Sequence, residues 1–418
     1  MRKLLLTMLL LPLLPAAAQS PIDLSGQWTL RLPNETTTVT LPGTLDTNKK
    51  GLSNEQKDET THLSRLYYYK GKAEYERTVV IPKSWAKKPL TLFLERTKPS
   101  TLYIDDRLID SCNNISTPHR YLVKALKPGQ HTIRLVIDNG SGVPEQLYAS
   151  SHAYTEDTQT NWNGIIGKMW LAPAKPLAPT SPQGTQTIFV RDRHFYDADG
   201  HRLFLRGKHD ACVWPLTGHC PMDVAAWRQY FSTCKDYGFN HVRFHSWCPP
   251  EAAFIAADEL HIYLQPELPF WGDFNAKDSV LMNFLYKEGE NILHEYGHHP
   301  SFAMFALGNE LWGSIDEMGR FVNHFRQIAP HILFTFGSNY YLGYQGVKPG
   351  MDYFTTCRVG GEAWGTYDTH TRGSFSFADA KTGGMLNTEY PNTQMTLDAG
   401  CSRSSVPVIS HETGQFQT

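Results

Sequence analysis

The sequence predicts a multidomain β plus α/β chain, in which an N-terminal jelly-roll β-sandwich precedes an incomplete (β/α)8 barrel. Two patterns lead to this prediction. Short strands separated by turn residues fill the chain up to about Leu171, and strands alternate with helices after Leu203. The length of 418 residues also exceeds that of one average domain.

The first residues have the pattern of a secretory signal peptide, which we place at residues 1–18. Arg2 and Lys3 are followed by an apolar run from Leu4 to Leu14, which is too short to cross a bilayer, and then by three alanines. No other segment approaches the ~18 consecutive apolar residues of a membrane span. We therefore expect a periplasmic or secreted protein with no membrane partner.

Residues 19–171 are expected to form the sandwich. Turn residues such as Pro128-Gly129 and Asn139-Gly140 separate short runs, several of which alternate apolar and polar side chains. The expected strands are Trp28–Leu32, Thr78–Ile81, Leu90–Leu94, Thr101–Ile104 and His131–Ile137. This part carries no convincing acid–base pair, so it is interpreted as a scaffold or a carbohydrate-binding module.

A linker rich in proline is expected at residues 172–186, followed by the barrel at residues 187–418. A short β segment at Thr187–Val190 and a turn at Asp197–Gly200 come first. The expected parallel strands are Leu203–Gly207, His241–His245, Ile262–Glu267, Phe302–Leu307, Ile332–Phe336, Tyr353–Cys357 and Pro407–Ser410. The expected helices are Asp223–Tyr237, Pro250–Leu260, Ser279–Tyr296 and Ile315–Ala329.

The seven expected parallel strands are one fewer than the usual barrel contains. Closure of a barrel requires its last strand, because that strand completes the sheet around the interior. We therefore expect either an uncounted strand or a chain that is a fragment of a longer barrel.

Composition excludes several classes of function. Lys and Arg number 39 against 41 Asp and Glu, so there is no basic field for nucleic acid. The seven cysteines include no Cys-x-x-Cys pair, which argues against a zinc site of that type; buried free thiols are expected, with one disulfide as the alternative. His298-His299 suggests a metal site, but neighbouring side chains on a strand point to opposite faces. No metal and no cofactor is expected.

Two glutamates follow expected strands, at the edge where parallel barrels hold their chemistry. Glu310 comes after the apolar run Phe302–Leu307, behind Gly308 and Asn309, and Glu412 comes after Pro407–Ser410. A retaining glycosidase needs two carboxyl groups ~5–5.5 Å apart, one to protonate the leaving oxygen and one to attack the sugar carbon. Asn309 could hydrogen-bond the sugar 2-hydroxyl. The alternative for each glutamate is a surface salt bridge.

The motifs around these residues resemble glycoside hydrolase family 2, the group of β-galactosidases, β-glucuronidases and β-mannosidases. The segment from His299-Pro300-Ser301 to Gly308-Asn309-Glu310 resembles its acid/base signature, and Pro407–Gln415 resembles its nucleophile segment. Further similar motifs are Leu24–Trp28, Tyr75–Arg77, Asn161–Gly167, Leu205–His209, Asn240–His245 and Asp258–Tyr263. The family usually has an immunoglobulin-like domain between sandwich and barrel, for which this sequence leaves no room.

The resemblance implies a role for each candidate residue. Glu310 would be the general acid/base, Glu412 the nucleophile, and Asn309 a sugar contact, while His245 and Glu267 would line the sugar subsite. His245 could instead be an ordinary strand-end histidine, and Glu267 could pair with an arginine inside the barrel.

Trp364 is the best candidate for an aromatic platform under the sugar, with a role in the core as the alternative. The expected function is a secreted retaining exo-β-glycosidase acting on oligo- or polysaccharides. The alternative is a non-catalytic carbohydrate-binding remnant of such an enzyme. The sequence gives no expectation for the sugar, the linkage or the oligomeric state.

Overall fold

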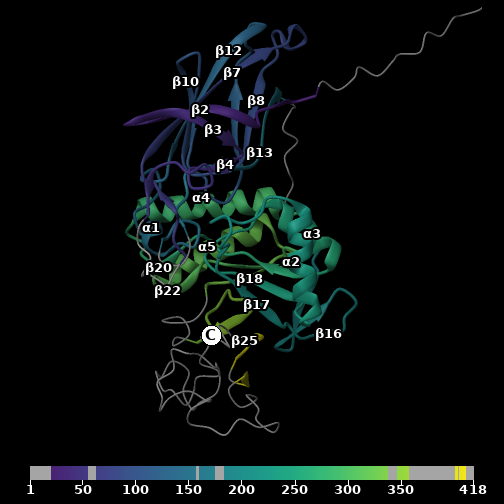
Figure 1. The fold of residues 1–418 in the computed structure, drawn as a ribbon. Coiled ribbons are helices and arrows are strands. Elements are labelled where there is room, and N and C mark those ends of the chain that lie inside the picture. The colour runs from purple at the N-terminus through teal and green to yellow at the C-terminus, as the bar shows by residue number, and fades with distance from the viewer. Residues whose placement is uncertain are drawn as a thin grey trace, which may run out of the picture.

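The structure is a computed structural model that describes residues 20–54, 63–156, 160–174, 183–337, 346–356, 401–402 and 404–410. Two antiparallel sheets lie at one end of the molecule, in purple and blue in Figure 1. Parallel strands and helices, in teal and green, lie at the other end, with helix α4 (Ser279–Tyr296) next to the sheets (Figure 1).

The N-terminal sheets form a β-sandwich, which confirms the predicted layer architecture. The first sheet contains β1 (Ile22–Asp23), β4 (Gly43–Thr44), β8 (Leu90–Thr97), β11 (His119–Val123) and β13 (Gly164–Pro173). The second contains β2 (Gly26–Leu32), β3 (Glu35–Leu41), β7 (Lys72–Ile81), β9 (Ser100–Ile104), β10 (Arg107–Cys112) and β12 (Gly129–Asp138). A separate two-stranded sheet pairs β5 (Leu52–Ser53) with β6 (Tyr67–Tyr68), and a 3-10 turn covers Lys83–Trp85.

One apolar core holds the two sheets together. In β12, Ile133, Leu135 and Ile137 are fully buried and alternate with more exposed residues, so their side chains point inward from one face. They share a cluster with Leu92 and Leu171 of the opposite sheet. All five strands expected from the sequence overlap observed ones, while β3, β10, β11 and β13 were not predicted.

A small antiparallel sheet follows the sandwich, made of β14 (Ile188–Arg191), β15 (His194–Asp197) and β16 (Arg202–Leu203). It corrects the prediction for the first parallel strand. Leu203 pairs with Phe195 in this small sheet, and the first parallel strand begins only at Gly207. The apolar run Leu203–Leu205 was misleading, because the true strand, Gly-Lys-His-Asp, is mostly polar.

The C-terminal part contains a series of parallel strands in the described residues. In chain order they are β17 (Gly207–Asp210), β18 (His241–Phe244), β19 (Tyr263–Gln265), β21 (Met304–Ala306), β23 (Leu333–Thr335), β24 (Phe354–Thr356) and β25 (Val408–Ser410). Isolated parallel bridges join β19 and its extension to the β21 region. A backbone hydrogen bond of 2.8 Å from Asp352 to Phe334 joins the β23 and β24 regions. Six of the seven expected strands thus overlap observed parallel strands, while the first shares only Gly207 with β17.

Helices connect the first of these strands, and their positions follow the sequence prediction closely. They are α2 (Val224–Asp236), α3 (Glu251–Leu260), α4 (Ser279–Tyr296) and α5 (Ile315–Ile328), with a short helix α1 (Gln146–Ser150) in the sandwich part. Asp223, Asp278 and Ser314 cap α2, α4 and α5 by accepting a backbone N–H. An extra parallel pair, β20 (Trp271–Phe274) and β22 (Asn309–Gly313), was not expected.

Helix α4 connects the parallel part to the sandwich through a buried carboxylate. The side chain of Glu288 is 1% exposed and accepts hydrogen bonds of 3.2 Å from the backbone nitrogens of Ile115 and Ser116. Burial raises the pKa of Glu288 to about 7, although these hydrogen bonds and nearby Arg96 oppose the rise. Arg96 of β8 donates to the carbonyl oxygen of Cys248 at 3.0 Å, which adds a second buried contact.

The six cysteines in the described residues are free thiols, in agreement with the expectation of unpaired cysteines; Cys357 lies outside those residues. Four of them, Cys212, Cys220, Cys234 and Cys248, are buried. Across the described ranges, no helix combines the length and the apolar character that a bilayer span requires.

Glu288 makes the stability of this interface depend on pH. Because its folded pKa lies above the value of 4.5 for an unperturbed glutamate, the folded chain holds the proton more tightly than the unfolded chain. Ionisation between about pH 5 and about pH 8 should therefore reduce the free energy of unfolding, by on the order of 3 kcal/mol. Urea titrations at several pH values should show this slope reduced in Glu288→Gln.

The matched control is Glu259→Gln on α3, whose exposed carboxylate pairs with Arg228. The pKa of Glu259 is lowered by that hydrogen bond, so its titration lies below the tested range. Equal pH slopes in wild type and Glu288→Gln would contradict the assignment.

Candidate active site

The carboxyl ends of neighbouring parallel strands bring several candidate residues together. In register, His209 of β17 lies beside Arg243 of β18, and Arg243 lies beside Gln265 of β19. Strands that run in the same direction end at the same edge of a sheet, so the residues that follow them share that edge. His245 follows β18, and Glu267 follows β19.

A buried ion pair stands at the centre of this edge. Arg243 donates from Nε to Oε1 of Glu267 at 2.6 Å and from Nη2 to Oε2 at 3.2 Å. Nη2 also donates to Oδ1 of Asn309 at 2.6 Å. Glu267 and Asn309 are fully buried and Arg243 is 5% exposed, so these charge-assisted bonds act in a medium of low polarity.

This network fixes where Asn309 lies and which way its amide points. Glu267 also accepts the backbone N–H of Ser246 at 2.8 Å, which connects the end of β18 to the same carboxylate. Glu267 is therefore paired with an arginine of a parallel strand, as the alternative interpretation of the sequence expected. The contact of Glu267 with a sugar stays a prediction.

Glu310 occupies a strained backbone position directly after Asn309. Its φ of 40° lies in the left-handed region, which costs a non-glycine residue about 1–3 kcal/mol. Gly308 has a φ of 132°, and a Cβ there would lie 2.3 Å from the carbonyl oxygen of Phe270. Asn309 donates its backbone N–H to that oxygen at 3.0 Å. Glycine thus allows the close approach that turns the chain and leaves Glu310 half-buried at the strand ends.

Three histidine rings pack together next to this network. His209 Nε2 and His245 Nδ1 are 2.6 Å apart, and the ring of His152 lies 4.2 Å from the ring of His245. Burial lowers the pKa of His152 to about 4, with a further contribution from the charge of Arg243. The pKa of His209 is lowered well below its usual value for the same two reasons. Both imidazoles are therefore neutral at neutral pH.

His152 comes from the sandwich part of the chain, immediately after α1. Its backbone nitrogen and its Nδ1 lie 3.1 and 2.8 Å from the hydroxyl of Ser246. Its ring stacks on Trp271 of β20 with a centroid distance of 6.0 Å. The sandwich therefore supplies one wall of the candidate site.

Sequence reasoning missed Arg243, His209 and His152. Arg243 was detectable, because a single charge within the apolar run His-Val-Arg-Phe-His must be paired when it is buried. His209 follows the misplaced first strand, so the shift in register hid it. For His152 there was no signal, since its local sequence does not reveal a contact with a distant part of the fold.

Two predicted site residues, Glu412 and Trp364, lie outside the described residues. The strand before Glu412 is described: β25 ends at Ser410 and runs parallel to β24. The roles assigned to both residues stay predictions.

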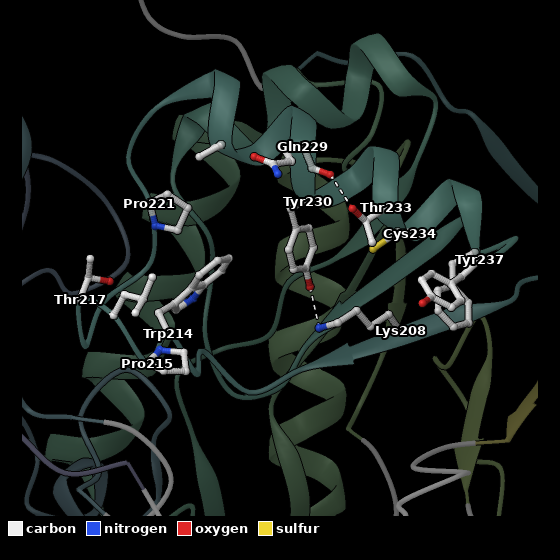
Figure 2. Close-up of a pocket in the computed structure, with 13 residues that line it drawn as sticks. Lys208, Trp214, Pro215, Thr217, Pro221, Gln229, Tyr230, Thr233, Cys234 and Tyr237 are labelled. Atoms are coloured by element: carbon white, nitrogen blue, oxygen red, sulfur yellow. Dashed lines mark hydrogen bonds between the residues drawn. The ribbon is translucent and has the colours of Figure 1, made fainter.

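An apolar cavity lies on the other face of β17. It measures about 710 Å³ and is lined by residues of α2 and of the loop before it, including Trp214 and Tyr230. Lys208 donates to the hydroxyl of Tyr230 at 2.7 Å across one side of this cavity (Figure 2). Because successive strand residues point to opposite faces, Lys208 faces α2 while His209 faces the candidate site.

We compared the chain with family models and with curated proteins. No family model matches the chain. A curated relative, a putative β-glucuronidase of Formosa agariphila, is 25% identical over 154 residues. That match covers 35% of this chain but only 18% of the relative, so the chain corresponds to a small part of the relative's length.

Solved structures match over most of the chain. A family 2 β-galacturonidase from Eisenbergiella tayi bound to galacturonate has a TM-score of 0.60 at 14% identity, covering 81% of this chain and 74% of that one. A β-glucuronidase from Ruminococcus gnavus in complex with D-glucaro-δ-lactam has a TM-score of 0.62 at 14% identity, covering 83% and 78%. These matches confirm, at the level of the fold, the resemblance to family 2 that the sequence motifs indicated.

The Arg243–Glu267 pair should dominate the stability of the parallel part. In Glu267→Gln the guanidinium of Arg243 loses the buried carboxylate that neutralises it, which should cost about 3–5 kcal/mol of unfolding free energy. Urea unfolding followed by tryptophan fluorescence should show this loss.

The control is Glu76→Gln, because the pair formed by Glu76 and Arg31 on the sandwich has similar geometry but is partly exposed. That control should lose at most about 1 kcal/mol. Equal losses would refute a special role for the buried pair.

Proposed function

We propose that this chain is a retaining exo-β-glycosidase of glycoside hydrolase family 2, which removes terminal sugars from oligo- or polysaccharides by double displacement. The observation that carries the proposal is the buried contact of Arg243 with Glu267 and Asn309, which holds Asn309 directly before the strained Glu310. Backbone strain next to a rigid polar network is typical of catalytic and ligand-binding sites, where side chains must be held in a fixed position.

In the proposed reaction, Glu412 attacks the anomeric carbon while Glu310 protonates the departing oxygen. Water then hydrolyses the glycosyl-enzyme, with Glu310 now acting as the base. Asn309, held by Arg243, hydrogen-bonds the sugar near its 2-hydroxyl, where such bonds strengthen in the transition state. The ring of His245 and the aromatic face of Trp364 complete the sugar subsite, and the carboxylate of Glu267 positions this group of residues.

The proposed architecture is a jelly-roll sandwich at residues 19–171, a linker at 172–186 and a (β/α)8-type barrel at 187–418. The parallel series from β17 to β25 and the helices between its strands support the barrel. Strand β13 continues to Pro173, two residues into the proposed linker. Residues 1–18 are proposed to direct export to the periplasm or the medium.

A uronic acid is the first sugar to test. The three similar proteins described above are named as β-glucuronidases or a β-galacturonidase. We propose that this chain takes the same class of substrate, a hexuronic acid at the non-reducing end. The sugar preference is separate from the mechanism, because specificity is set by loops around a shared site.

The test uses purified full chain with aryl β-glycosides of glucuronic acid, galacturonic acid, galactose, glucose and mannose. Glu412→Ala should abolish turnover. Glu310→Ala should slow the hydrolysis of natural oligosaccharides by about 10²–10⁴-fold, because the leaving group loses its acid. Glycosides with very acidic phenol leaving groups need no such acid, so for them the first step should be much less affected.

Glu290→Ala on α4 is the control, because this carboxylate pairs with His324 away from the strand ends. Wild-type rates of oligosaccharide hydrolysis in Glu310→Ala, or wild-type rates on any substrate in Glu412→Ala, would refute the assignment. Sugar binding without any hydrolysis across the panel would instead favour a carbohydrate-binding remnant.

A further inference from the structure

A second polar cluster lies away from the strand ends, where the beginning of α3 meets the end of α4. The donor atoms of Glu251, His298 and His299 all lie within 4.8 Å of one another. Glu251 is the first residue of α3, and the two histidines follow the last turn of α4. Glu251 and His298 are exposed, whereas His299 is 6% exposed.

A carboxylate fixes the orientation of the His299 ring. Nδ1 of His299 is 2.6 Å from Oδ2 of Asp258, and the ring of Phe254 stacks against the imidazole at 5.4 Å. The other oxygen of Asp258 accepts the backbone N–H of Ser301 at 2.8 Å. Because a carboxylate oxygen accepts hydrogen bonds, the ring donates from Nδ1, and the lone pair of His299 is on Nε2.

That Nε2 atom is buried and has no hydrogen-bond partner among the described residues. A buried acceptor without a partner is costly, because it has given up its water. Glu251 and Asp258 are seven residues apart on α3 and therefore share a helix face. A ring nitrogen of His299 lies within 4.8 Å of the donor atoms of Glu251 and His298. Because Nδ1 contacts Asp258, Nε2 is the ring nitrogen that is available to a ligand at this cluster.

We propose that Glu251, His298 and His299 form a zinc site, with Asp258 supporting the His299 ligand from behind. Two imidazoles and one carboxylate are ligands that Zn²⁺ accepts, and three protein ligands leave a position for water. A histidine that binds metal through one nitrogen usually donates its other N–H to a carboxylate, as His299 does to Asp258.

The geometry requires only a small adjustment. With Zn–N and Zn–O bonds of about 2.0–2.2 Å, tetrahedral donors lie roughly 3.4 Å apart, against the 4.8 Å that bounds the present cluster. The two exposed side chains can close this difference, while the buried ligand stays fixed.

The sequence argument against metal binding at His298-His299 assumed the alternating geometry of a strand. In the structure these residues lie in the turn after α4, and their rings are 4.2 Å apart. Adjacent side chains in a turn can therefore point to the same place. The third ligand, Glu251, was not visible from the sequence, because 47 residues separate it from His298.

The experiment measures Zn²⁺ binding to the full chain after removal of metal with a chelator. Calorimetry should show one equivalent bound, and Zn²⁺ should raise the unfolding temperature by mass action. Substituted Co²⁺ should give the visible absorption of a four-coordinate site. His298→Ala and Glu251→Gln should each weaken binding by at least about tenfold, and Asp258→Asn by about 10–100-fold.

The control is His201→Ala, in a second cluster with Asp197 and Asp199 in a turn where two of the three side chains are exposed. This variant should bind Zn²⁺ as wild type does. Absence of binding, binding that persists in both His298→Ala and Glu251→Gln, or binding lost only in His201→Ala would overturn the proposal. None of these measurements depends on glycoside hydrolysis, so the outcome is independent of the proposed function.

Discussion

The buried pair of Arg243 and Glu267 is the interaction on which the candidate site depends. A carboxylate with no exposed surface is tolerated only when it is neutralised and hydrogen-bonded, and Arg243 supplies both conditions. The same guanidinium then positions Asn309. One charge pair thus joins residues from three neighbouring strand regions and defines the place where β22 begins with Asn309 and Glu310.

The sandwich and the parallel part form this site together. Buried polar contacts cross the interface between the two parts. Arg96 of the sandwich donates to the carbonyl oxygen of Cys248, and the backbone N–H groups of Ile115 and Ser116 donate to Glu288. These contacts hold the sandwich in the orientation that puts His152 against Ser246 and Trp271. The sandwich is therefore more than a scaffold, since it completes the wall of aromatic and imidazole rings.

The sequence was most informative where periodic patterns are long and local. Helix α4 has the predicted limits, and α2, α3 and α5 differ by one or two residues, because capping residues and apolar spacing mark helices directly. The first parallel strand was misplaced because a functional strand end is polar, which weakens the usual apolar signal. Strand β22 was missed because Gly308 was interpreted as the end of a strand. His152 required knowledge of how the two parts pack, which no local pattern contains.

His152 belongs to the sandwich but packs against residues of the parallel part, and this limits how the two parts can be recombined. A chimera that keeps the parallel strands but takes its sandwich from another source would leave the rings of His245 and Trp271 without their stacking partner. It would also remove the group that contacts the hydroxyl of Ser246, a residue whose φ of 48° is itself strained. The two parts are therefore expected to be exchanged only as a unit.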